Sequence, residues 1–434
     1  MASTSKARSL DLDRVLDEQI DWRYKSFPAT PPTSIREVAR RDWNVLDGDF
    51  MFPVMLLKQS ALRHNIGAMA ALCESHGISL APHGKTSMSP QLFQMQLDAG
   101  AWAVTAATMW QVRVWRAFGA TRVILANELV EPAAIRWIAN ELRRDPEFDF
   151  YCLVDSVAEV RLLETTLDGA GLERRLPVLL ELGLPGGRTG CRTRDQAFEV
   201  ARAVAASHRL SLAGVEGFEG IIGGTSLGSM LEKVDTFMGE MRALVLELDG
   251  AHLFDQSAEV MISAGGSAFL DRVIAGFGKP LGLSRPARVV LRSGCYVTHD
   301  SVHYKEQSPF GSRLADTGPL EEALEAWGVV LSRPEPGLAL LGFGKRDVPH
   351  DLELPVPRLA KRLGERLRTL RAGASITALN DQHAYLKVSD DDELAVGDLV
   401  GCGVSHPCTA FDKWRLLPVV DDSYRVVDTV LTYF

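Results

Sequence analysis

Leu80-Ala81-Pro82-His83-Gly84-Lys85-Thr86 joins a short apolar run, Gly77–Ala81, to the helical pattern of Met88–Phe93. This order predicts a strand–loop–helix unit in which Lys85 lies just past the C-terminal end of the strand. In parallel α/β folds, that edge of the sheet is where functional residues collect. A lysine there can be desolvated, lose its proton at modest cost and attack a carbonyl carbon. A solvent-exposed lysine in an ordinary loop is the alternative interpretation.

The same alternation of apolar runs and amphipathic helices continues to about residue 286. Helical spacing of apolar residues predicts helices over 60–76, 91–99, 109–118, 132–143, 157–170, 194–206 and 231–248. Short β-type runs separate them, at 52–57, 78–81, 103–106, 123–126, 149–154, 176–181, 210–215 and 259–263. One uninterrupted series of this kind predicts an α/β fold, a TIM-like (β/α)8 barrel over residues 51–286. A doubly wound parallel sheet is the alternative.

The pattern changes after residue 286. β-type runs at 289–292, 326–331, 338–341, 375–379, 384–388 and 398–402 are separated by Gly and Pro turns, with little helix. Residues 287–434 are therefore predicted to form a C-terminal β-rich domain that carries a metal site. Residues 1–50 are charged and contain a Pro-rich stretch at 27–32. We interpret them as an N-terminal extension that packs on the main body.

The composition excludes several classes of protein. With 434 residues, 46% of them hydrophobic and 24% charged, the chain has ordinary globular values and room for two domains. A net charge of −9 does not suggest nucleic acid or an anionic membrane as a partner. The six cysteines have no framework spacing, which favours a reducing compartment. No signal peptide or membrane span is recognised, so a cytoplasmic location is expected.

Ser405-His406-Pro407-Cys408-Thr409 carries a second candidate site. In extended chain, residues i and i+2 point to the same side, so His406 and Cys408 can bind one metal ion. Imidazole and thiolate favour Zn²⁺, with Mn²⁺ or another divalent ion as the alternative. Two ligands leave coordination positions open, as in a catalytic metal site. Because the pattern is short, a chance His-x-Cys pair without a metal is the other interpretation.

The lysine motif and the His-x-Cys pair together resemble the D-serine dehydratase/D-threonine aldolase family of alanine racemase-like, fold-type III pyridoxal-phosphate (PLP) enzymes. The resemblance covers about residues 50–434. It implies a barrel followed by a β domain, PLP bound through Lys85, and zinc bound by His406 and Cys408. It also implies a homodimer in which one subunit's β domain completes the partner's barrel mouth.

Further site residues follow from the resemblance. Arg188 takes the place of an arginine near the phenolic oxygen of the cofactor ring, where a fixed cation favours a phenolate. Gly265, Gly266 and Ser267 correspond to a phosphate-binding segment, and their backbone N–H groups can cradle an anion. The remaining candidates are His83 and Tyr296 as cofactor contacts, and His383 near the metal or in proton transfer. An ordinary turn or core position is the alternative for each.

The family's dehydratases have His-x-Cys where its D-threonine aldolases have His-x-Asp, so Cys408 favours a dehydratase. The expected reaction converts D-serine or a related D-β-hydroxy amino acid to a 2-oxo acid and ammonia, with Lys85, Arg188 and His383 as catalytic residues. Val404-Ser405 stands where the family usually has Pro-Asn, which leaves the substrate range open. A metal-dependent D-threonine aldolase, which forms glycine and an aldehyde, is the first alternative. An amino-acid racemase and a non-catalytic PLP carrier are the others.

Overall fold

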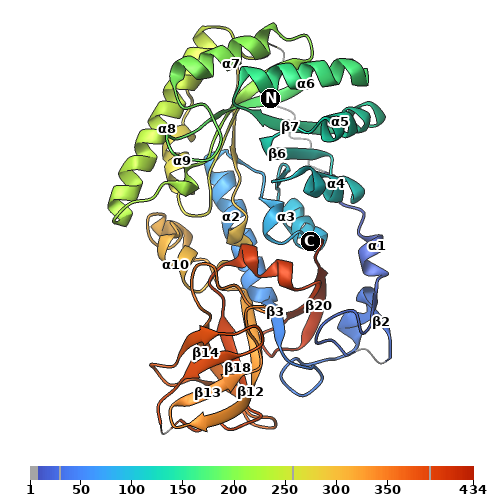
Figure 1. Ribbon diagram of the computed structural model, residues 1–434, viewed down its shortest axis with the longest axis vertical. Coiled ribbons are helices and arrows are strands. Elements are labelled where there is room, and N and C mark those ends of the chain that lie inside the picture. The colour runs from blue at the N-terminus through green and yellow to red at the C-terminus, as the bar shows by residue number, and fades with distance from the viewer. Residues whose placement is uncertain (1–7, 29–30, 257–258, 391) are drawn as a thin grey trace.

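Eight parallel strands form the barrel in the upper half of Figure 1. The two edges of the sheet meet where Trp102 N–H donates to the Leu80 carbonyl (2.7 Å) and Thr105 N–H donates to the Pro82 carbonyl (2.9 Å). The computed structural model describes residues 8–28, 31–256, 259–390 and 392–434. In chain order around the barrel, the strands are β4 (Ser79–Leu80), β5 (Val104–Ala106), β6 (Arg122–Glu128), β7 (Asp149–Val154), β8 (Leu176–Leu182), β9 (Leu210–Gly217), β10 (Val260–Ala264) and β11 (Ala287–Leu291).

Helices cover the outside of the barrel (Figure 1). Several begin at a hydroxyl side chain that accepts the backbone N–H three residues later, which satisfies a donor that the helix itself leaves unpaired. These capping residues are Thr108, Ser156, Thr193 and Ser226. The helices are α2 (Gln59–His76), α3 (Pro90–Asp98), α4 (Met109–Ala117), α5 (Pro132–Arg144), α6 (Val157–Ala170), α7 (Arg194–Ala206), α8 (Leu227–Gly250) and α9 (Leu270–Phe277).

A layer of apolar side chains fills the barrel and is separate from the core between strands and helices. Each barrel strand, or the residue next to it, contributes one member: Ala81, Ala103, Ile124, Leu153, Leu179, Ala213, Met261 and Val290. The barrel is therefore a packed core and not a pore. Inward-facing side chains further along the strands, such as Glu181 two residues after Leu179, lie at the mouth.

The second domain, at the bottom of Figure 1, is built on an antiparallel sheet with the order β15-β14-β18-β12-β13-β17-β16. β19 pairs with β20 and with β3, and β3 joins them to β12. The short helix α10 (His303–Gln307) leads into the sheet. The strands are β3 (Val54–Lys58), β12 (Leu324–Glu335), β13 (Leu338–Leu341), β14 (Val356–Lys361), β15 (Arg368–Thr369), β16 (Ser375–Leu379), β17 (Ala384–Lys387), β18 (Leu399–Gly403), β19 (Leu416–Val420) and β20 (Val426–Leu431).

The predicted fold, a barrel followed by a β-rich domain, is confirmed, but two strands change places. β3, expected as the first barrel strand, pairs antiparallel with β12, where Val54 faces Trp327. β11, expected in the second domain, pairs with β10 on one side and with β4 on the other, and so completes the barrel. A strand's own residues report burial and alternation but not its neighbours. The predicted series of eight barrel strands therefore began one strand too early, at β3 instead of β4.

The segment before β3 packs on both domains. It contains α1 (Asp13–Leu16), β1 (Gln19–Ile20) and β2 (Thr33–Ser34). Lys25 Nζ lies 2.9 Å from Asp347 Oδ1 and 3.7 Å from the centre of the Trp414 ring, in the second domain. Asp11 N–H donates to the Phe118 carbonyl of the barrel (2.9 Å). Residues 1–7 and 29–30, the start of the chain and part of its Pro-rich stretch, lie outside the described residues. Within the described ranges, no helix combines the length and apolar character needed to cross a lipid bilayer.

Replacement of Gly214 in β9 should destabilise the barrel. A Cβ at this position would overlap the backbone carbonyl of Met261, its partner on β10. We expect Gly214→Ala to lower the free energy of unfolding by about 1–3 kcal/mol, as overpacking does in well-packed cores. Gly239→Ala is the matched control, since a Cβ at Gly239 in α8 meets nothing within 4 Å. That variant should be stabilised by about 0.5–1 kcal/mol in urea unfolding. Equal stability of the two variants would contradict the tight β9–β10 contact.

Candidate active site

One cavity of about 390 Å³ lies at the mouth of the barrel and is lined by both domains. The barrel contributes side chains past the C-terminal ends of its strands, among them Lys85, Arg188 and Ser267. The second domain contributes His406 and Cys408. Thr86 and Cys408, 322 positions apart in the chain, approach to 3.3 Å between Oγ1 and Sγ. The two motifs that the sequence singled out therefore meet in one place.

Lys85 belongs to a 3-10 turn, Gly84–Thr86, in the loop after β4. Gly84 is needed there, because a Cβ would overlap the indole ring of Trp115 on α4. The loop is tied to the segment after β11 by a hydrogen bond from His83 N–H to the Ser293 carbonyl (3.2 Å). These contacts fix the path of the loop, and Lys85 lines the cavity half-buried, as the motif predicted.

His83 lines the cavity beside Lys85. Its Nδ1 atom is buried and has no hydrogen-bond partner among the described residues. Burial, followed by the nearby charges of Lys85 and Arg292, lowers the pKa of His83 well below its ordinary value. The ring is therefore neutral near pH 7, and Nδ1 can make a hydrogen bond to a bound ligand.

Arg188 comes from the glycine-rich loop between β8 and α7 and lines the cavity. Its guanidinium carbon lies 4.7 Å from the centre of the Phe218 ring, a cation–π contact. The loop closes on itself through Arg192, whose Nη1 donates to the Gly190 carbonyl (2.8 Å). Gly190 has a φ of +96°, a conformation that favours glycine. The glycines thus shape a loop that presents Arg188 to the cavity.

A buried ion pair between Arg292 and Glu216 lines the same cavity and was not found from the sequence. Arg292 follows β11, Glu216 lies on β9, and they are 5% and 1% exposed. Burial raises the pKa of Glu216 to about 7, although the Arg292 charge opposes this shift. Breaking such a pair leaves an uncompensated charge, so it holds both side chains in place.

The segment expected to hold a phosphate group already holds a carboxylate of the protein. Gly265 N–H donates to Glu219 Oε2 (3.1 Å) and Gly266 N–H donates to Glu219 Oε1 (2.6 Å). The N–H groups therefore cradle an anion, as their sequence predicts, but in this structure that anion is Glu219. Ser267 lines the cavity beside them, with its Oγ 2.8 Å from Ser293 Oγ.

His406 and Cys408 lie in contact, although Pro407–Thr409 forms a 3-10 turn and not the extended chain from which their proximity was predicted. His406 Nδ1 lies 2.6 Å from Asp351 Oδ2, and the imidazole also makes a hydrogen bond with the Cys408 thiol. Thr409 donates to the other oxygen of Asp351 (2.7 Å). Burial lowers the pKa of His406, but the bonds to Cys408 and Asp351 outweigh it and raise that pKa to about 9. Hydrogen bonds from Cys295 and His406 hold the pKa of Cys408 well below its ordinary value. These contacts favour the thiolate of Cys408, which is the form that binds metals.

Three predicted site residues do not line the cavity, and one of them, Gly265, binds Glu219 as described above. Tyr296 is buried in the core, and its hydroxyl donates to Gln96 Oε1 (2.9 Å). Tyr304, eight residues later on α10, lines the cavity instead and makes a hydrogen bond with Cys295. His383 is exposed in the turn between β16 and β17 of the second domain and does not line the cavity. Tyr296 and His383 are therefore not brought to the cavity of their own subunit, and the roles predicted for them stay predictions.

Carboxylates gather beside the mouth. One ligand oxygen each from Glu128, Asp155 and Glu181 lies within 4.8 Å of the others. Burial and the neighbouring Glu181 raise the pKa of Glu128 to about 9. Burial likewise raises the pKa of nearby Glu159 to about 7. This side of the barrel mouth is thus less negative near neutral pH than its composition suggests.

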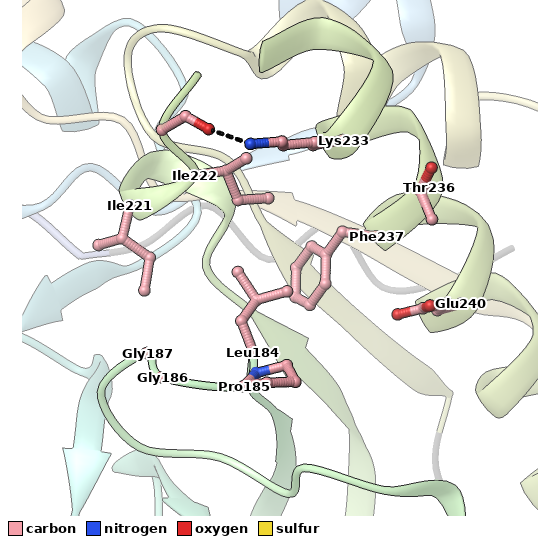
Figure 2. A pocket seen from close by; sticks show the side chains of 11 residues that line it. Leu184, Pro185, Gly186, Gly187, Ile221, Ile222, Lys233, Thr236, Phe237 and Glu240 are labelled. Carbon is pink, nitrogen blue, oxygen red and sulfur yellow. Dashed lines mark hydrogen bonds between the residues drawn. The ribbon is translucent and has the colours of Figure 1, made fainter. Parts of the chain in front are cut away.

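A second hollow, of about 450 Å³, lies outside the mouth (Figure 2). It is bounded by the loop at Leu184, by Ile221 and Ile222, and by the side of α8 that carries Phe237. Its lysine, Lys233, donates to the Gly223 carbonyl (2.9 Å). Its lining includes none of the predicted site residues. We therefore assign the chemistry to the cavity above Lys85.

Comparison with solved structures identifies the fold. A D-threonine aldolase from Filomicrobium marinum matches with a TM-score of 0.72 at 23% identity, over 88% of this chain and 95% of that chain. An alanine racemase-like protein from Idiomarina loihiensis matches with a TM-score of 0.68 at 16% identity, over 88% and 96%. The chain therefore has the alanine racemase-like fold. A D-threo-3-hydroxyaspartate dehydratase from Delftia sp. HT23 also shares this fold, with a TM-score of 0.66 at 20% identity, over 88% and 97%.

Comparisons of sequence agree with the fold. Residues 323–420 match the family described as a putative serine dehydratase domain. A 3-hydroxy-D-aspartate aldolase from Paracoccus denitrificans is 25% identical over 353 residues, which are 81% of this chain and 86% of that protein. A D-threonine aldolase from an Arthrobacter species is 24% identical over 377 residues, 85% and 89% of the two chains. These relatives are lyases, and the prediction of a lyase is confirmed at that level.

The residues of the cavity fit the two groups that the fold family implies. A lysine, an arginine and an anion cradle with an adjacent serine are the donors that a phosphorylated aldehyde cofactor requires. The orphaned Nδ1 of His83 provides one more polar atom without a partner. A thiolate beside an imidazole that is oriented by a carboxylate is the donor set of a zinc site.

The buried carboxyl of Glu159 should make stability depend on pH. Its pKa is raised from 4.5 to about 7, so its contribution to stability is present below pH 4.5 and is lost as the pH rises through about 7. We expect Glu159→Gln to reduce the difference in unfolding free energy between pH 5 and pH 8 by up to about 3 kcal/mol. Urea unfolding at both pH values measures this. Glu199→Gln, at an exposed position on α7, is the control that should leave the difference unchanged. An unaltered difference in Glu159→Gln would show that its carboxyl titrates normally.

Proposed function

We propose that this protein is a PLP- and zinc-dependent lyase that dehydrates D-serine or a related D-β-hydroxy amino acid to a 2-oxo acid and ammonia. The observation that carries the proposal is the meeting of Lys85 with the His406–Cys408 pair in one cavity. The relatives support the broader statement, since two of them are named for aldol cleavage of 3-hydroxy-D-aspartate and D-threonine. Cys408 supports the dehydratase, through the His-x-Cys pattern of that branch.

Two bound groups complete the chemistry. PLP would supply an electron sink for the α-carbon, and Zn²⁺ would supply a Lewis acid for the β-hydroxyl. We assign Lys85 to holding PLP and, once released by the substrate, to accepting the α-proton at Nζ. We assign Arg188 to stabilising negative charge on the phenolic oxygen of the cofactor ring. His406 and Cys408 would hold the metal, and Asp351 fixes the imidazole by its bond to Nδ1.

A retro-aldol lyase is the second candidate. Both curated relatives described above are aldolases, and the same lysine and metal serve this reaction. It differs from dehydration in the proton removed, which comes from the β-hydroxyl and not from the α-carbon. The products then are glycine and an aldehyde.

We also propose that the active form is a cytoplasmic homodimer in which the β domain of one subunit completes the partner's barrel mouth. Arg188 and Thr189 are exposed at the rim of the cavity in the single chain. A partner at this rim would exclude water from the reacting groups, which strengthens every electrostatic interaction among them.

Product analysis separates the two lyase reactions. The protein with added PLP and Zn²⁺ should convert D-threonine to 2-oxobutanoate and ammonia, measured by chromatography and an ammonia assay. D-Serine and D-threo-3-hydroxyaspartate are tested in parallel. Glycine and acetaldehyde from D-threonine would establish the aldolase instead. Formation of an epimer, or no turnover of any of the three compounds, would contradict the proposed lyase.

Lys85→Ala should lose the visible absorbance of lysine-bound PLP and at least about 10²–10⁴-fold in kcat, because it removes both the anchor and the base. Lys233→Ala is the matched control, since Lys233 lies in the separate hollow of Figure 2. It should keep both the absorbance and the activity. Unchanged absorbance in Lys85→Ala would assign the cofactor to another lysine.

A further inference from the structure

Cys295 lies against the predicted metal pair. Its Sγ is 3.2 Å from Cys408 Sγ, although the two residues are 113 positions apart in the chain. Cys295 is 5% exposed and is not in a disulfide. It follows β11, on the barrel side of the cavity, whereas Cys408 belongs to the second domain. The two domains thus present one thiol each to the same point.

The position of Cys295 is fixed by close packing. A Cβ on Gly294 would lie 2.7 Å from the His83 carbonyl oxygen and 2.8 Å from Thr86 Oγ1. Only glycine fits at this position without a shift of these neighbours. Thr86 Oγ1 also lies 3.9 Å from Cys295 Sγ and 3.3 Å from Cys408 Sγ. Tyr304 makes a further hydrogen bond to Cys295. The thiol is therefore held toward Cys408 by its neighbours.

The spacing suits a shared metal ion. Two sulfur ligands at about 2.3 Å from a tetrahedral zinc ion stand about 3.8 Å apart. The two Sγ atoms would have to separate by about 0.6 Å from their 3.2 Å distance, a shift that small side-chain rotations supply. His406, whose Nδ1 is bonded to Asp351, makes a hydrogen bond with Cys408, so its imidazole lies beside the two sulfur atoms.

We propose that Cys295 is the third protein ligand of the metal ion, so that zinc is held by Cys295, His406 and Cys408. This rests on the proposed function, which needs a metal at His406 and Cys408. All three residues line the cavity that contains Lys85. A Cys₂His set is a known arrangement for catalytic zinc and leaves one tetrahedral position open, here for the β-hydroxyl of the substrate. Two thiolates also select Zn²⁺ over Mn²⁺ and Mg²⁺, which prefer oxygen ligands.

Cobalt replacement counts the thiolates without any substitution. The full-length protein with Co²⁺ in place of Zn²⁺ should show sulfur-to-cobalt charge transfer of the strength of two thiolates, with visible bands of tetrahedral cobalt. Cys295→Ala should lower the charge-transfer absorbance per cobalt by about half. Charge transfer of a single thiolate in the unsubstituted protein would overturn the proposal.

Zinc affinity gives the second readout. In competition with a chromophoric chelator, Cys295→Ala and Cys295→Ser should bind Zn²⁺ at least about 10–100-fold more weakly, the range seen when even an outer partner of a ligand is lost. Cys73→Ala is the matched control, because Cys73 is also buried and free but lies on α2. It should bind zinc as the unsubstituted protein does. Equal affinity in all variants would overturn the proposal.

The outcomes separate this inference from the proposed function. Tight binding that depends on Cys295, without turnover of any D-β-hydroxy amino acid, would support the ligand set and reject the function. Zinc-dependent turnover, together with unchanged zinc affinity in Cys295→Ala, would support the proposed function and reject Cys295 as a ligand. A loss of two free thiols in air that zinc does not prevent would assign Cys295 and Cys408 to a disulfide and overturn their joint role as ligands.

Discussion

The pairing of β4 with β11 is the constraint on which the site depends. These strands are the first and the last of the barrel in the chain, and their register places Leu80 beside Leu291. The loops that follow them are therefore neighbours, which brings Lys85 and Thr86 next to Arg292 and Cys295. The His83–Ser293 hydrogen bond continues this pairing beyond the strands. If β11 lay in the second domain, as its place in the sequence suggested, the cavity would lose both its buried cation and the thiol beside Cys408.

Local signals in the sequence were sufficient for the two motifs and for seven of the eight helices around the barrel; α9 was not predicted. The predicted helices at 157–170 and 194–206 have the observed bounds, because capping residues and apolar spacing act within one turn. The pairs Glu216–Arg292 and Asp351–His406 were missed, since their members are 76 and 55 positions apart and nothing local links them. Tyr296 was misplaced for a related reason. It lies in a short 3-10 turn without periodicity, where sequence does not reveal which way a side chain points.

The mouth of the barrel carries groups that can bind an anion, although the whole chain has a net charge of −9. Arg188 and Arg292 face the cavity, and the acidic groups among them are either paired or buried. Glu219 is the clearest case, because two backbone N–H groups hold its carboxylate where the sequence predicts a phosphate group. Burial still raises the pKa of Glu219 against those hydrogen bonds. An internal carboxylate thus shows both that the cradle binds anions and that an anionic ligand has to compete for it.

Thr86 links the two halves of the chemistry. It is adjacent to Lys85 in the chain, and its hydroxyl lies within hydrogen-bonding distance of the thiol of Cys408. A reaction that removes a proton from one carbon and a hydroxyl from the next requires its base and its metal within a few ångströms of each other. In the proposed reaction the barrel would supply the base and the second domain would supply a metal ligand, so neither domain alone would satisfy that requirement. The contact at Thr86 therefore makes the docking of the two domains, together with the pairing of β4 with β11, a feature that sets the geometry of the site.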